Sequence, residues 1–479
     1  MEEISFSTSP RNKNRLLYVG IILAIIIGWL TSILGFAIPA ILLGVTFLIS
    51  FLLIVFNKPR LGLIVFICYC FLMWFLYREV GDLPFSYAVE GLLALIWLAV
   101  IFHNSANFDW SFMKNEITFI GLAWCLLTVL EFFNPTTLGN VNSWIGDSRY
   151  PFLWIFIVPL SMTIFNKYKD LNLFLYIILF FSLIAAFNGI RQIQVGLTQA
   201  EKAFLVSSPT HVIFGKLRVF SYYSDAGQFG ASMAQMCVIA LILVLGPFKL
   251  WKRGVCAVAA VIFLYAMSIS GTRGAMFCLF GGILVVLVAS KNIKIVMVAG
   301  ILGLLGFGFL KFTFIGHNIS EVRRMRSALN PNDASLNLRF YNQQRLAAYL
   351  KHYPFGGGIG SIGYASRGAA KKAPFANIEP DSYWVKIWAN YGIVGLTIWF
   401  SMMMYIVGKC SGIIWNIKNQ RLKIKLTALT AGATGIFLCS YGNEVMNNVP
   451  SSIVLYISWA FIFLGPKLDR EAQIAENNG

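Results

Sequence analysis

The chain has 479 residues, of which 58% are hydrophobic and only 12% are charged. Soluble domains carry about 25% charged residues, so this composition excludes an ordinary soluble protein. Apolar runs of about 20 residues recur along the chain, each long enough to cross the hydrocarbon core of a bilayer as a helix. The formal net charge is +18. In a membrane protein this excess indicates basic cytoplasmic loops and contact with anionic lipid or phosphate, and nucleic acid is not an expected partner.

The apolar runs predict an all-α, polytopic helical bundle with about fourteen spans and a partly helical periplasmic loop. No small-residue cleavage site follows the first run, so a retained span is expected there instead of a cleaved signal peptide. We predict one membrane domain over residues 1–479, with N-terminal spans in 16–190, a first external loop in 191–228, central spans in 229–312, a large external loop in 313–381 and C-terminal spans in 382–466. The predicted spans begin near Leu16, Ala37, Leu61, Tyr87, Ile117, Pro151, Leu171, Phe229, Val255, Ala275, Ile295, Ser382, Leu426 and Ser451.

The distribution of basic residues predicts the orientation. Short connections on one face hold 20 Lys and Arg, whereas those on the other face hold only Arg78, Arg149 and Arg273. This bias places both termini in the cytoplasm and both long loops outside. The eight cysteines form no CxxC pair, and the four histidines are scattered, so no disulfide framework, metal site or cofactor is expected.

The large external loop is the longest polar segment of the chain. NISEVRRMRSALN and SLNLRFYNQQRLAAYLKHY each predict a helix with a polar N-cap. In the second helix, Arg339 lies at the edge of the apolar face that includes Phe340 and Leu346, whereas Arg345 lies nearly opposite, so Arg339 is predicted to point inward. The glycines of the following PFGGGIG, among them Gly356 and Gly358, are expected to bring backbone N–H groups close to a ligand.

Several arginines lie at the predicted external boundary of the membrane: Arg149, Arg191, Arg218, Arg273 and Arg339. A guanidinium binds phosphate oxygens in a bidentate manner, which predicts an anion site. The alternative is that each side chain extends to the lipid headgroups. Arg273 carries the anion hypothesis furthest, because a charge in a short turn between two spans is costly unless it is paired.

Two carboxylates precede the span that begins near Ser382. Asp381 is a candidate general base for a sugar hydroxyl, and Glu379 is the second choice. Because Asp381 follows Pro380 and opens a helix, it is equally a candidate helix cap. Asp225 is predicted to cap the span that follows it.

Aromatic residues and one histidine complete the candidates on the external face. Tyr222, Tyr223 and Tyr383 are candidates for stacking on a sugar ring, and the alternative is an interfacial aromatic belt. His352 lies directly before the glycine run and is a candidate for a role in the site.

The order of these motifs resembles the O-antigen polymerase and O-antigen ligase family of bacterial envelope glycosyltransferases. LRVFSYYSDAGQFGASM is followed by SGTRGA, by LRFYNQQRLAAYLKHYPFGGGIG in a long loop, and by DSYWVKIWANYGIVGLTIW. The resemblance covers approximately Leu217 to Phe400. It implies a metal-independent, inverting glycosyltransferase of the bacterial inner membrane that acts on the periplasmic face.

The resemblance also implies partners and roles. The donor would be a glycan on undecaprenyl pyrophosphate, held by Arg218, Arg273 and Arg339, and Arg149 is a weaker match for this role. The acceptor would be a second glycan. Membrane lipids and a chain-length regulator would be further partners. Ligases usually carry a histidine and an asparagine where this chain has Asp381 and Ser382. This departure favours a polymerase that extends one lipid-linked repeat unit onto another. The alternatives are an O-antigen ligase, which transfers glycan to lipid A-core or another acceptor, and a lipid-linked oligosaccharide flippase.

Overall fold

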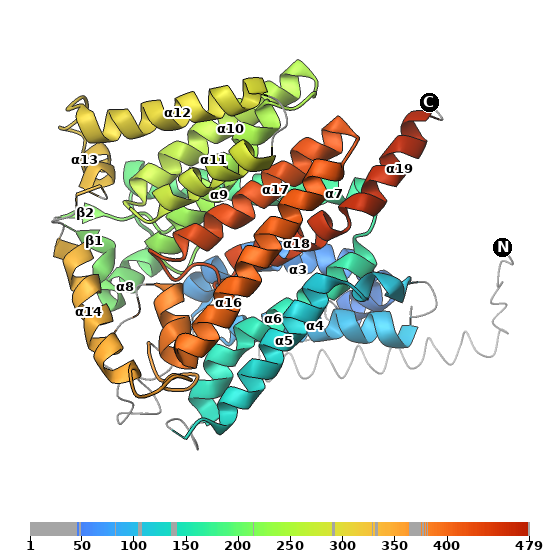
Figure 1. Ribbon diagram of the computed structural model, residues 1–479, viewed down its shortest axis with the longest axis horizontal. Coiled ribbons are helices and arrows are strands. Elements are labelled where there is room, and N and C mark those ends of the chain that lie inside the picture. The colour runs from blue at the N-terminus through green and yellow to red at the C-terminus, as the bar shows by residue number, and fades with distance from the viewer. Residues whose placement is uncertain are drawn as a thin grey trace, which may run out of the picture.

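The computed structural model shows a bundle of long helices with a small amount of strand (Figure 1). It describes residues 46, 49–81, 83–103, 108–135, 141–213, 215–289, 293–327, 329–330, 334–363, 375, 378, 380 and 382–477. The α-helices are α3 (Pro59–Val80), α4 (Phe85–Leu98), α5 (Glu116–Leu130), α6 (Val141–Ile164), α7 (Tyr168–Gln194), α8 (Gln199–Ser207), α9 (Ala226–Val244), α10 (Leu250–Ile269), α11 (Ala275–Ala289), α12 (Ile293–Phe312), α13 (Ser320–Ser327), α14 (Ala334–Leu350), α16 (Tyr383–Asn416), α17 (Gln420–Cys439), α18 (Ser451–Phe463) and α19 (Gly465–Asn477).

Short elements connect these helices. Strands β1 (Val212–Ile213) and β2 (Lys216–Leu217) form an antiparallel hairpin in which Val212 pairs with Leu217. A π-helical turn extends α4 and three 3-10 turns lie in connections: η1 (Ala99–His103), η3 (Trp110–Met113), η4 (Glu131–Phe133) and η5 (Pro209–His211).

The predicted all-α membrane fold is confirmed. Every span predicted from Leu61 onward coincides with a helix. Within the described residues, eight helices are long and apolar enough to cross a membrane, or nine if α18 and α19, bent by 58°, count as one span. The span predicted at Leu16 and the start of the span predicted at Ala37 lie outside the described residues. The total of fourteen therefore stays a prediction.

Helices α9 and α17 form the centre of the bundle. Both are buried along most of their length, and both are rich in small residues. A Cβ at Gly281 of α11 would lie only 3.1 Å from the Cα of Gly435 in α17. Small residues allow membrane helices to approach this closely, and the dispersion attraction between the packed backbones stabilises the bundle.

The prediction of a span that starts near Pro151 was wrong about its boundary. Helix α6 begins ten residues earlier and contains Pro151 and Pro159, so Arg149 lies inside a helix and not in a connection. Proline is tolerated inside helices of a membrane bundle because neighbouring groups satisfy the backbone carbonyls that it frees.

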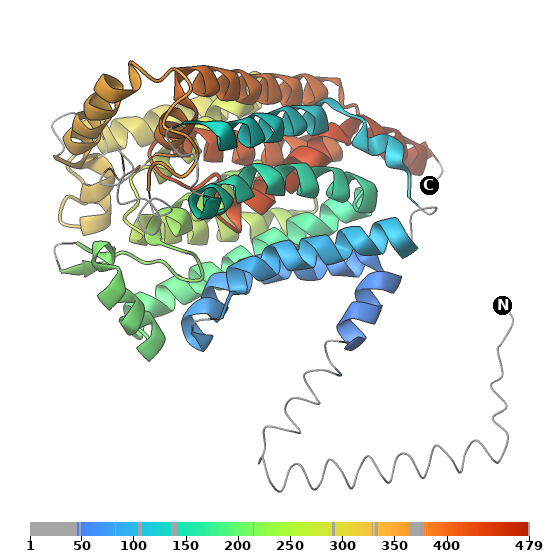
Figure 2. The same ribbon diagram turned by 90° about the horizontal axis from the view of Figure 1, so that it is seen from below.

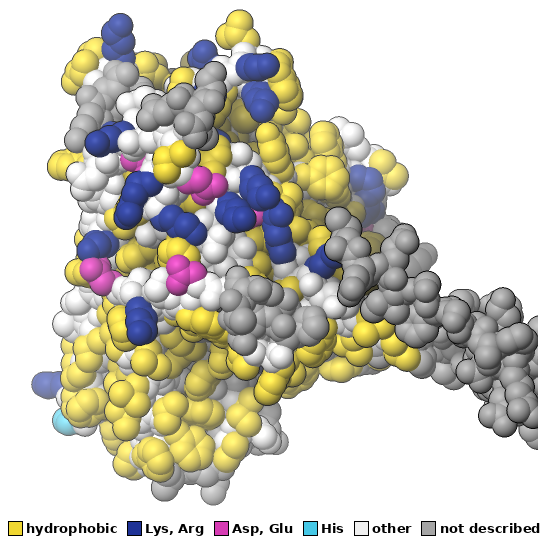
Figure 3. All heavy atoms as spheres, turned by 90° about the vertical axis from the view of Figure 1, so that its right-hand side faces the viewer, with side chains coloured by type: hydrophobic (Ala, Val, Ile, Leu, Met, Phe, Trp, Pro, Cys, Tyr) yellow, Lys and Arg dark blue, Asp and Glu magenta, His cyan; other side chains and the backbone are white. Residues whose placement is uncertain are grey.

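The two ends of the bundle differ in structure. Helices α8, α13 and α14 gather at the end opposite the C-terminus in both ribbon views (Figures 1 and 2). We name this end the loop end, because it carries the described parts of both predicted long loops. The other end, which carries the C-terminus, displays many Lys and Arg side chains (Figure 3). Basic side chains at this end agree with the sequence-based prediction that it faces the cytoplasm.

Candidate functional site

A short turn at the loop end joins α10 to α11. Gly271 adopts a φ of +60°, and the backbone N–H of Thr272 donates to Ser270 Oγ at 3.1 Å. Thr272 Oγ1 donates to the carbonyl of Ala226, the first residue of α9, at 2.7 Å. The turn is therefore held by side-chain hydrogen bonds on both sides, and it projects Arg273 from a rigid base.

Arginines from three parts of the chain converge on this turn. Arg218 Nη2 lies 3.5 Å from Thr272 Oγ1, and Arg273 Nη1 donates to Ser327 Oγ of α13 at 3.3 Å. A Cβ at Gly271 would lie 3.1 Å from Cδ and Nε of Arg324, so that side chain rests on the turn. We name Arg218, Arg273 and Arg324, with the residues Gly271–Arg273, the arginine turn. Three guanidinium groups beside one turn produce a positive field suited to an anion with several oxygens.

The helical phase of α14 correctly predicts which of its two arginines, Arg339 or Arg345, is more exposed to solvent. Arg339 is half-buried, whereas Arg345 is exposed and lies 5.9 Å from the ring centroid of Tyr341. The predicted apolar face is only partly confirmed. Leu346 is fully buried, but Phe340 remains 43% exposed, because the small core under α14 forms only at its last turns.

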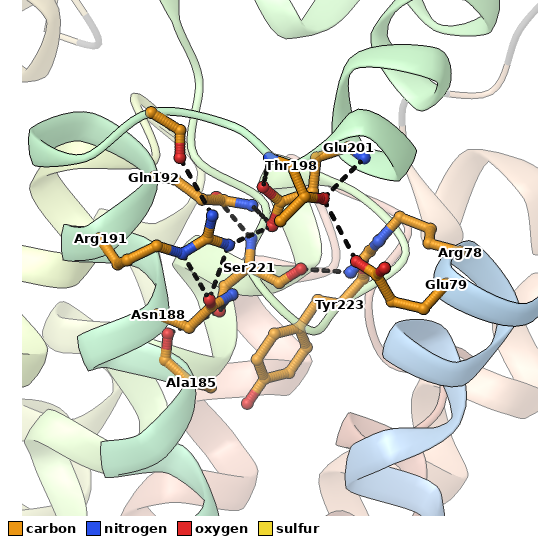
Figure 4. Close-up of polar contacts among 11 residues, drawn as sticks. Arg78, Glu79, Ala185, Asn188, Arg191, Gln192, Thr198, Glu201, Ser221 and Tyr223 are labelled. Atoms are coloured by element: carbon orange, nitrogen blue, oxygen red, sulfur yellow. Dashed lines mark hydrogen bonds and ion pairs between the residues drawn. The ribbon is translucent and has the colours of Figure 1, made fainter.

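A second group of arginines, Arg191 at the end of α7 and Arg78 at the end of α3, surrounds the first loop and has a different environment (Figure 4). Arg191 Nη2 pairs with Glu201 Oε1 at 2.5 Å, and Gln192 Nε2 donates to the same oxygen at 2.8 Å. Arg78 Nη1 donates to the carbonyl of Tyr223 at 2.7 Å, and its Nη2 donates to the carbonyl of Ser221. We name this group of residues the loop brace. Burial alone would raise the pKa of Glu201, but the hydrogen bonds from Arg191 and Gln192 lower it below its ordinary value.

The N-terminus of α9 is capped from two directions. Asp225 Oδ1 accepts a hydrogen bond from the backbone N–H of Gln228 at 2.9 Å, so the predicted helix cap is present. His211 Nδ1 donates to the carbonyl of Ser208 at 3.1 Å, and its Nε2 accepts from the N–H of Ala226 at 3.3 Å. Burial lowers the pKa of His211 below its ordinary value. The neutral imidazole is therefore the form that completes this cap.

The glycine run after α14 docks on a kink in α16. Gly392 has a φ of +65° inside the helix, and a Cβ there would collide with the carbonyl of Pro354. Gly357 N–H donates to the carbonyl of Ala389 at 2.8 Å, and Gly358 N–H donates to the carbonyl of Asn390 at 3.0 Å. These two N–H groups therefore satisfy carbonyls of the kink, and the N–H of Gly356 donates to the carbonyl of Tyr353 at 2.9 Å. Contact of Gly356 or Gly358 with a ligand stays a prediction.

The connection between α17 and α18, residues 440–450, links the separate parts of the loop end. We name it the strap. Ser440 accepts hydrogen bonds through its carbonyl from Tyr383 N–H at 2.9 Å and from Ser382 Oγ at 3.4 Å. Three residues later, the side chain of Asn443 lies directly against Gly274, next to Arg273. The strap thus connects the start of α16 to the arginine turn.

Sequence reasoning missed a buried ionic cluster beside the strap. Lys386 Nζ lies 3.0 Å from Asp147 Oδ1 and 2.6 Å from Glu444 Oε1. These residues come from α16, α6 and the strap. The one available signal was a lysine within a predicted span, which requires a partner with negative charge.

The remaining predicted site residues occupy different environments. Arg149 pairs with Glu90 at 2.5 Å, and no described contact joins it to the arginine turn. Tyr223 and Tyr383 are buried in the core, whereas Tyr222 is partly buried against the ring of Phe75. His352 is exposed, Gly356 packs against the α16 kink, and Asp381 and Glu379 lie outside the described residues.

The chain matches a known protein family over part of its length. Residues 258–400 match the family model described as O-antigen ligase. The matched stretch includes Arg273, Arg324, Arg339 and the outer part of α16, whereas Arg218 and the strap lie outside it. This match confirms the family resemblance and supports a glycan-processing role of the ligase or polymerase type. A comparison with curated proteins finds no match.

Proposed function

We propose that the protein is an inverting, metal-independent glycosyltransferase that polymerises oligosaccharide repeat units carried on undecaprenyl pyrophosphate. The observation that carries the proposal is the convergence of Arg218, Arg273 and Arg324 on one turn at the loop end. Two of these arginines lie within the stretch that matches the O-antigen ligase family. In this proposal the loop end faces the periplasm, and the basic terminal end faces the cytoplasm of a bacterial inner-membrane protein.

The arginines would act on the leaving group. When the bond between the anomeric carbon and the pyrophosphate oxygen breaks, negative charge grows on the pyrophosphate. Guanidinium groups that are already in place stabilise this charge without reorganisation. We assign this role to Arg218 and Arg273, with Arg339 at the edge of the site. Arg149 is the weakest candidate, because it already pairs with Glu90.

The acceptor hydroxyl would attack from the opposite side of the sugar. Its oxygen bonds to the anomeric carbon as the pyrophosphate departs, and a general base takes the hydroxyl proton. We assign the base to Asp381, or else to Glu379. Support comes from Ser382, the next residue after Asp381, whose Oγ is hydrogen-bonded to the strap that also packs beside Arg273.

A ligase is the second candidate, and the description of the matching family favours it. A ligase would use the same donor chemistry but would transfer finished glycan to lipid A-core or another non-polymer acceptor. The distinction rests on the acceptor, so it requires a product measurement. A chain-length regulator is a proposed partner of the polymerase only.

The test uses cells that lack the chromosomal copy and express a variant. Arg273→Ala and Asp381→Ala should each abolish the ladder of polymer lengths, while single lipid-linked repeat units still reach the periplasm. Arg421→Ala, which replaces an exposed arginine at the start of α17, is the matched control and should retain the ladder.

Other results identify the alternatives. Polymer that accumulates on the lipid carrier and reaches no acceptor would indicate a ligase. Repeat units trapped on the cytoplasmic side would indicate a flippase. Retention of the full ladder in both loop-end variants would contradict the site assignment.

A further inference from the structure

The buried cluster at the strap holds unbalanced charge. The side chain of Lys386 is 9% exposed and pairs with both Asp147, at 8%, and Glu444, at 27%. Two carboxylates therefore share one ammonium group. Burying a carboxylate is expensive unless its charge is compensated and its lone pairs are satisfied, so an arrangement of this kind needs a reason beyond stability.

The two oxygens of Glu444 have different surroundings. Oε1 accepts from Lys386 Nζ at 2.6 Å and from Asn447 Nδ2 at 2.8 Å. Every side-chain hydrogen bond that the described residues make to Glu444 ends on this oxygen. Glu444 is also the most exposed member of the cluster. One oxygen is thus anchored inside the protein, and Oε2 is the oxygen that remains for a ligand.

A buried neighbour points to a ligand independently. Asn447 is 1% exposed and directs its amide at Glu444, yet its Oδ1 has no hydrogen-bond partner among the described residues. Buried acceptors in native folds are nearly always satisfied, so Asn447 Oδ1 is an acceptor to which a ligand can donate a hydrogen bond. A group that both donates and accepts hydrogen bonds would suit this pair.

The strap places Glu444 and Asn447 beside the proposed reaction centre. Asn443, the residue before Glu444, lies against Gly274 and therefore next to Arg273. Ser440, four residues before Glu444, is bonded to Ser382 at the start of α16. Glu444 is thus carried by the same short segment that links the arginine turn to α16.

We propose that Glu444 binds a hydroxyl group of the acceptor sugar through Oε2, with Asn447 as a second ligand and with Lys386 and Asp147 as positioning residues. This inference rests on the proposed function, since it supplies the acceptor side of that reaction. A carboxylate binds sugar hydroxyls by charge-assisted hydrogen bonds, which are stronger than neutral ones. The anchor on Oε1 holds the carboxylate in one orientation before the acceptor arrives.

The experiment measures binding to the full-length protein in detergent. The acceptor probe is the free repeat-unit oligosaccharide, released from the cell's own polymer by mild acid and lacking lipid and pyrophosphate. The donor probe is undecaprenyl pyrophosphate. Glu444→Gln should weaken binding of the oligosaccharide about tenfold or more while leaving binding of the lipid pyrophosphate unchanged. Arg273→Ala should show the opposite pattern.

The matched control is a second Glu–Lys pair on another part of the bundle. Glu116 pairs with Lys409 at 2.7 Å, and both are substantially exposed. Glu116→Gln should change the binding of neither probe. Glu444→Asp keeps the charge but shortens the side chain by one methylene, so it should bind the oligosaccharide with intermediate affinity if reach to the acceptor matters.

Each outcome has one meaning. Unchanged oligosaccharide binding in Glu444→Gln would overturn this inference and leave the proposed function intact. An equal loss for both probes, with a lowered melting temperature, would make the cluster purely structural and would also overturn it. Failure of the unaltered protein to bind the oligosaccharide at millimolar concentration would contradict the glycan assignment itself.

Discussion

The loop brace and the arginine turn lie at the same end of the molecule and use the same residue type differently. In the brace, Arg191 contacts a carboxylate at 2.5 Å, and Arg78 is locked onto two backbone carbonyls. In the arginine turn, the contacts of Arg218 and Arg273 include side-chain hydroxyls at 3.5 Å and 3.3 Å and, for Arg218, the carbonyl of Thr210 at 3.4 Å. Short contacts to a carboxylate or to two carbonyls fix a guanidinium inside the fold. The arginine turn differs in that guanidinium groups from three segments of the chain converge on one turn, which concentrates positive charge there.

This difference teaches that external position alone does not identify a ligand-binding arginine. The sequence places all five boundary arginines at the external boundary, although Arg273 is the strongest candidate because of its short turn. The structure adds that Arg149 pairs with Glu90 and Arg191 with Glu201, whereas Arg218 and Arg273 lie at one turn together with Arg324. We therefore expect variants of the turn to lose activity and variants of the brace to lose stability.

The largest expected effect belongs to Arg273→Ala. Loss of a preorganised cation beside the leaving group should lower the rate of polymer extension about 100-fold or more. Arg273→Lys should recover part of the rate, because it restores the charge without the bidentate geometry. Rates would be measured with purified protein and lipid-linked repeat units. If Arg273→Ala extended polymer at nearly the rate of the unaltered protein, the arginine turn would not differ from the loop brace in function.

Arg191→Ala should act on stability. The substitution leaves the carboxylate of Glu201, 6% exposed, without its cation, which costs about 3 kcal/mol for a buried pair. The melting temperature in detergent should fall, while the rate per folded molecule should change little. A large loss of rate at unchanged melting temperature would instead place the brace in the active site.

Gly271→Ala tests geometry without changing charge. A left-handed φ costs about 1–2 kcal/mol for alanine, and the new methyl group would press on Arg324. We expect α13 to shift and the extension rate to fall about tenfold. Gly196→Ala in the first loop also places an alanine at positive φ, here +103°, but in an open environment, so it serves as the control for backbone strain alone.

The smallest effect is a pH dependence confined to the first loop. The folded-state pKa of His211 lies below its ordinary value of 6.5, so its stability contribution is complete above pH 6.5 and is lost as the pH falls through the lowered pKa. A proton on Nε2 would repel the N–H of Ala226, and it would face Arg78 and Arg218 with only Asp225 to compensate.

Hydrogen exchange in residues 208–226 would measure this effect. Exchange should accelerate a few-fold between pH 7.5 and 5.5, after correction for intrinsic rates, and α13 should not respond. His211→Gln cannot titrate and should remove the dependence. An equal response in the Gln variant would assign the effect to another group.

Sequence patterns over short stretches of the chain correctly predicted helices, a helix cap and the exposure of side chains on a helix. Apolar runs predicted the helices from α3 onward, the polar N-cap rule predicted the role of Asp225, and helical phase predicted the exposure of Arg339 and Arg345. These features depend on residues that are near one another in the chain.

The parts that failed or were missed depend on tertiary contacts. The Arg149–Glu90 pair joins two helices, and the Lys386 cluster joins three segments far apart in the sequence. The use of the Gly357 and Gly358 N–H groups could not be predicted, because the carbonyls they satisfy are released by a kink in a distant helix. The start of α6 was predicted at Pro151 instead of Val141 because a proline marks the first turn of a helix more reliably in soluble proteins than in a membrane bundle.

The kink at Gly392 has a consequence for biogenesis. The carbonyls of Ala389 and Asn390 receive their hydrogen bonds from the glycine loop, which precedes α16 in the chain. In a lipid environment each unsatisfied carbonyl costs several kcal/mol. The outer turns of α16 are therefore stable only when the loop has already docked. We expect translocation of the loop and integration of this helix to occur as one cooperative step during synthesis.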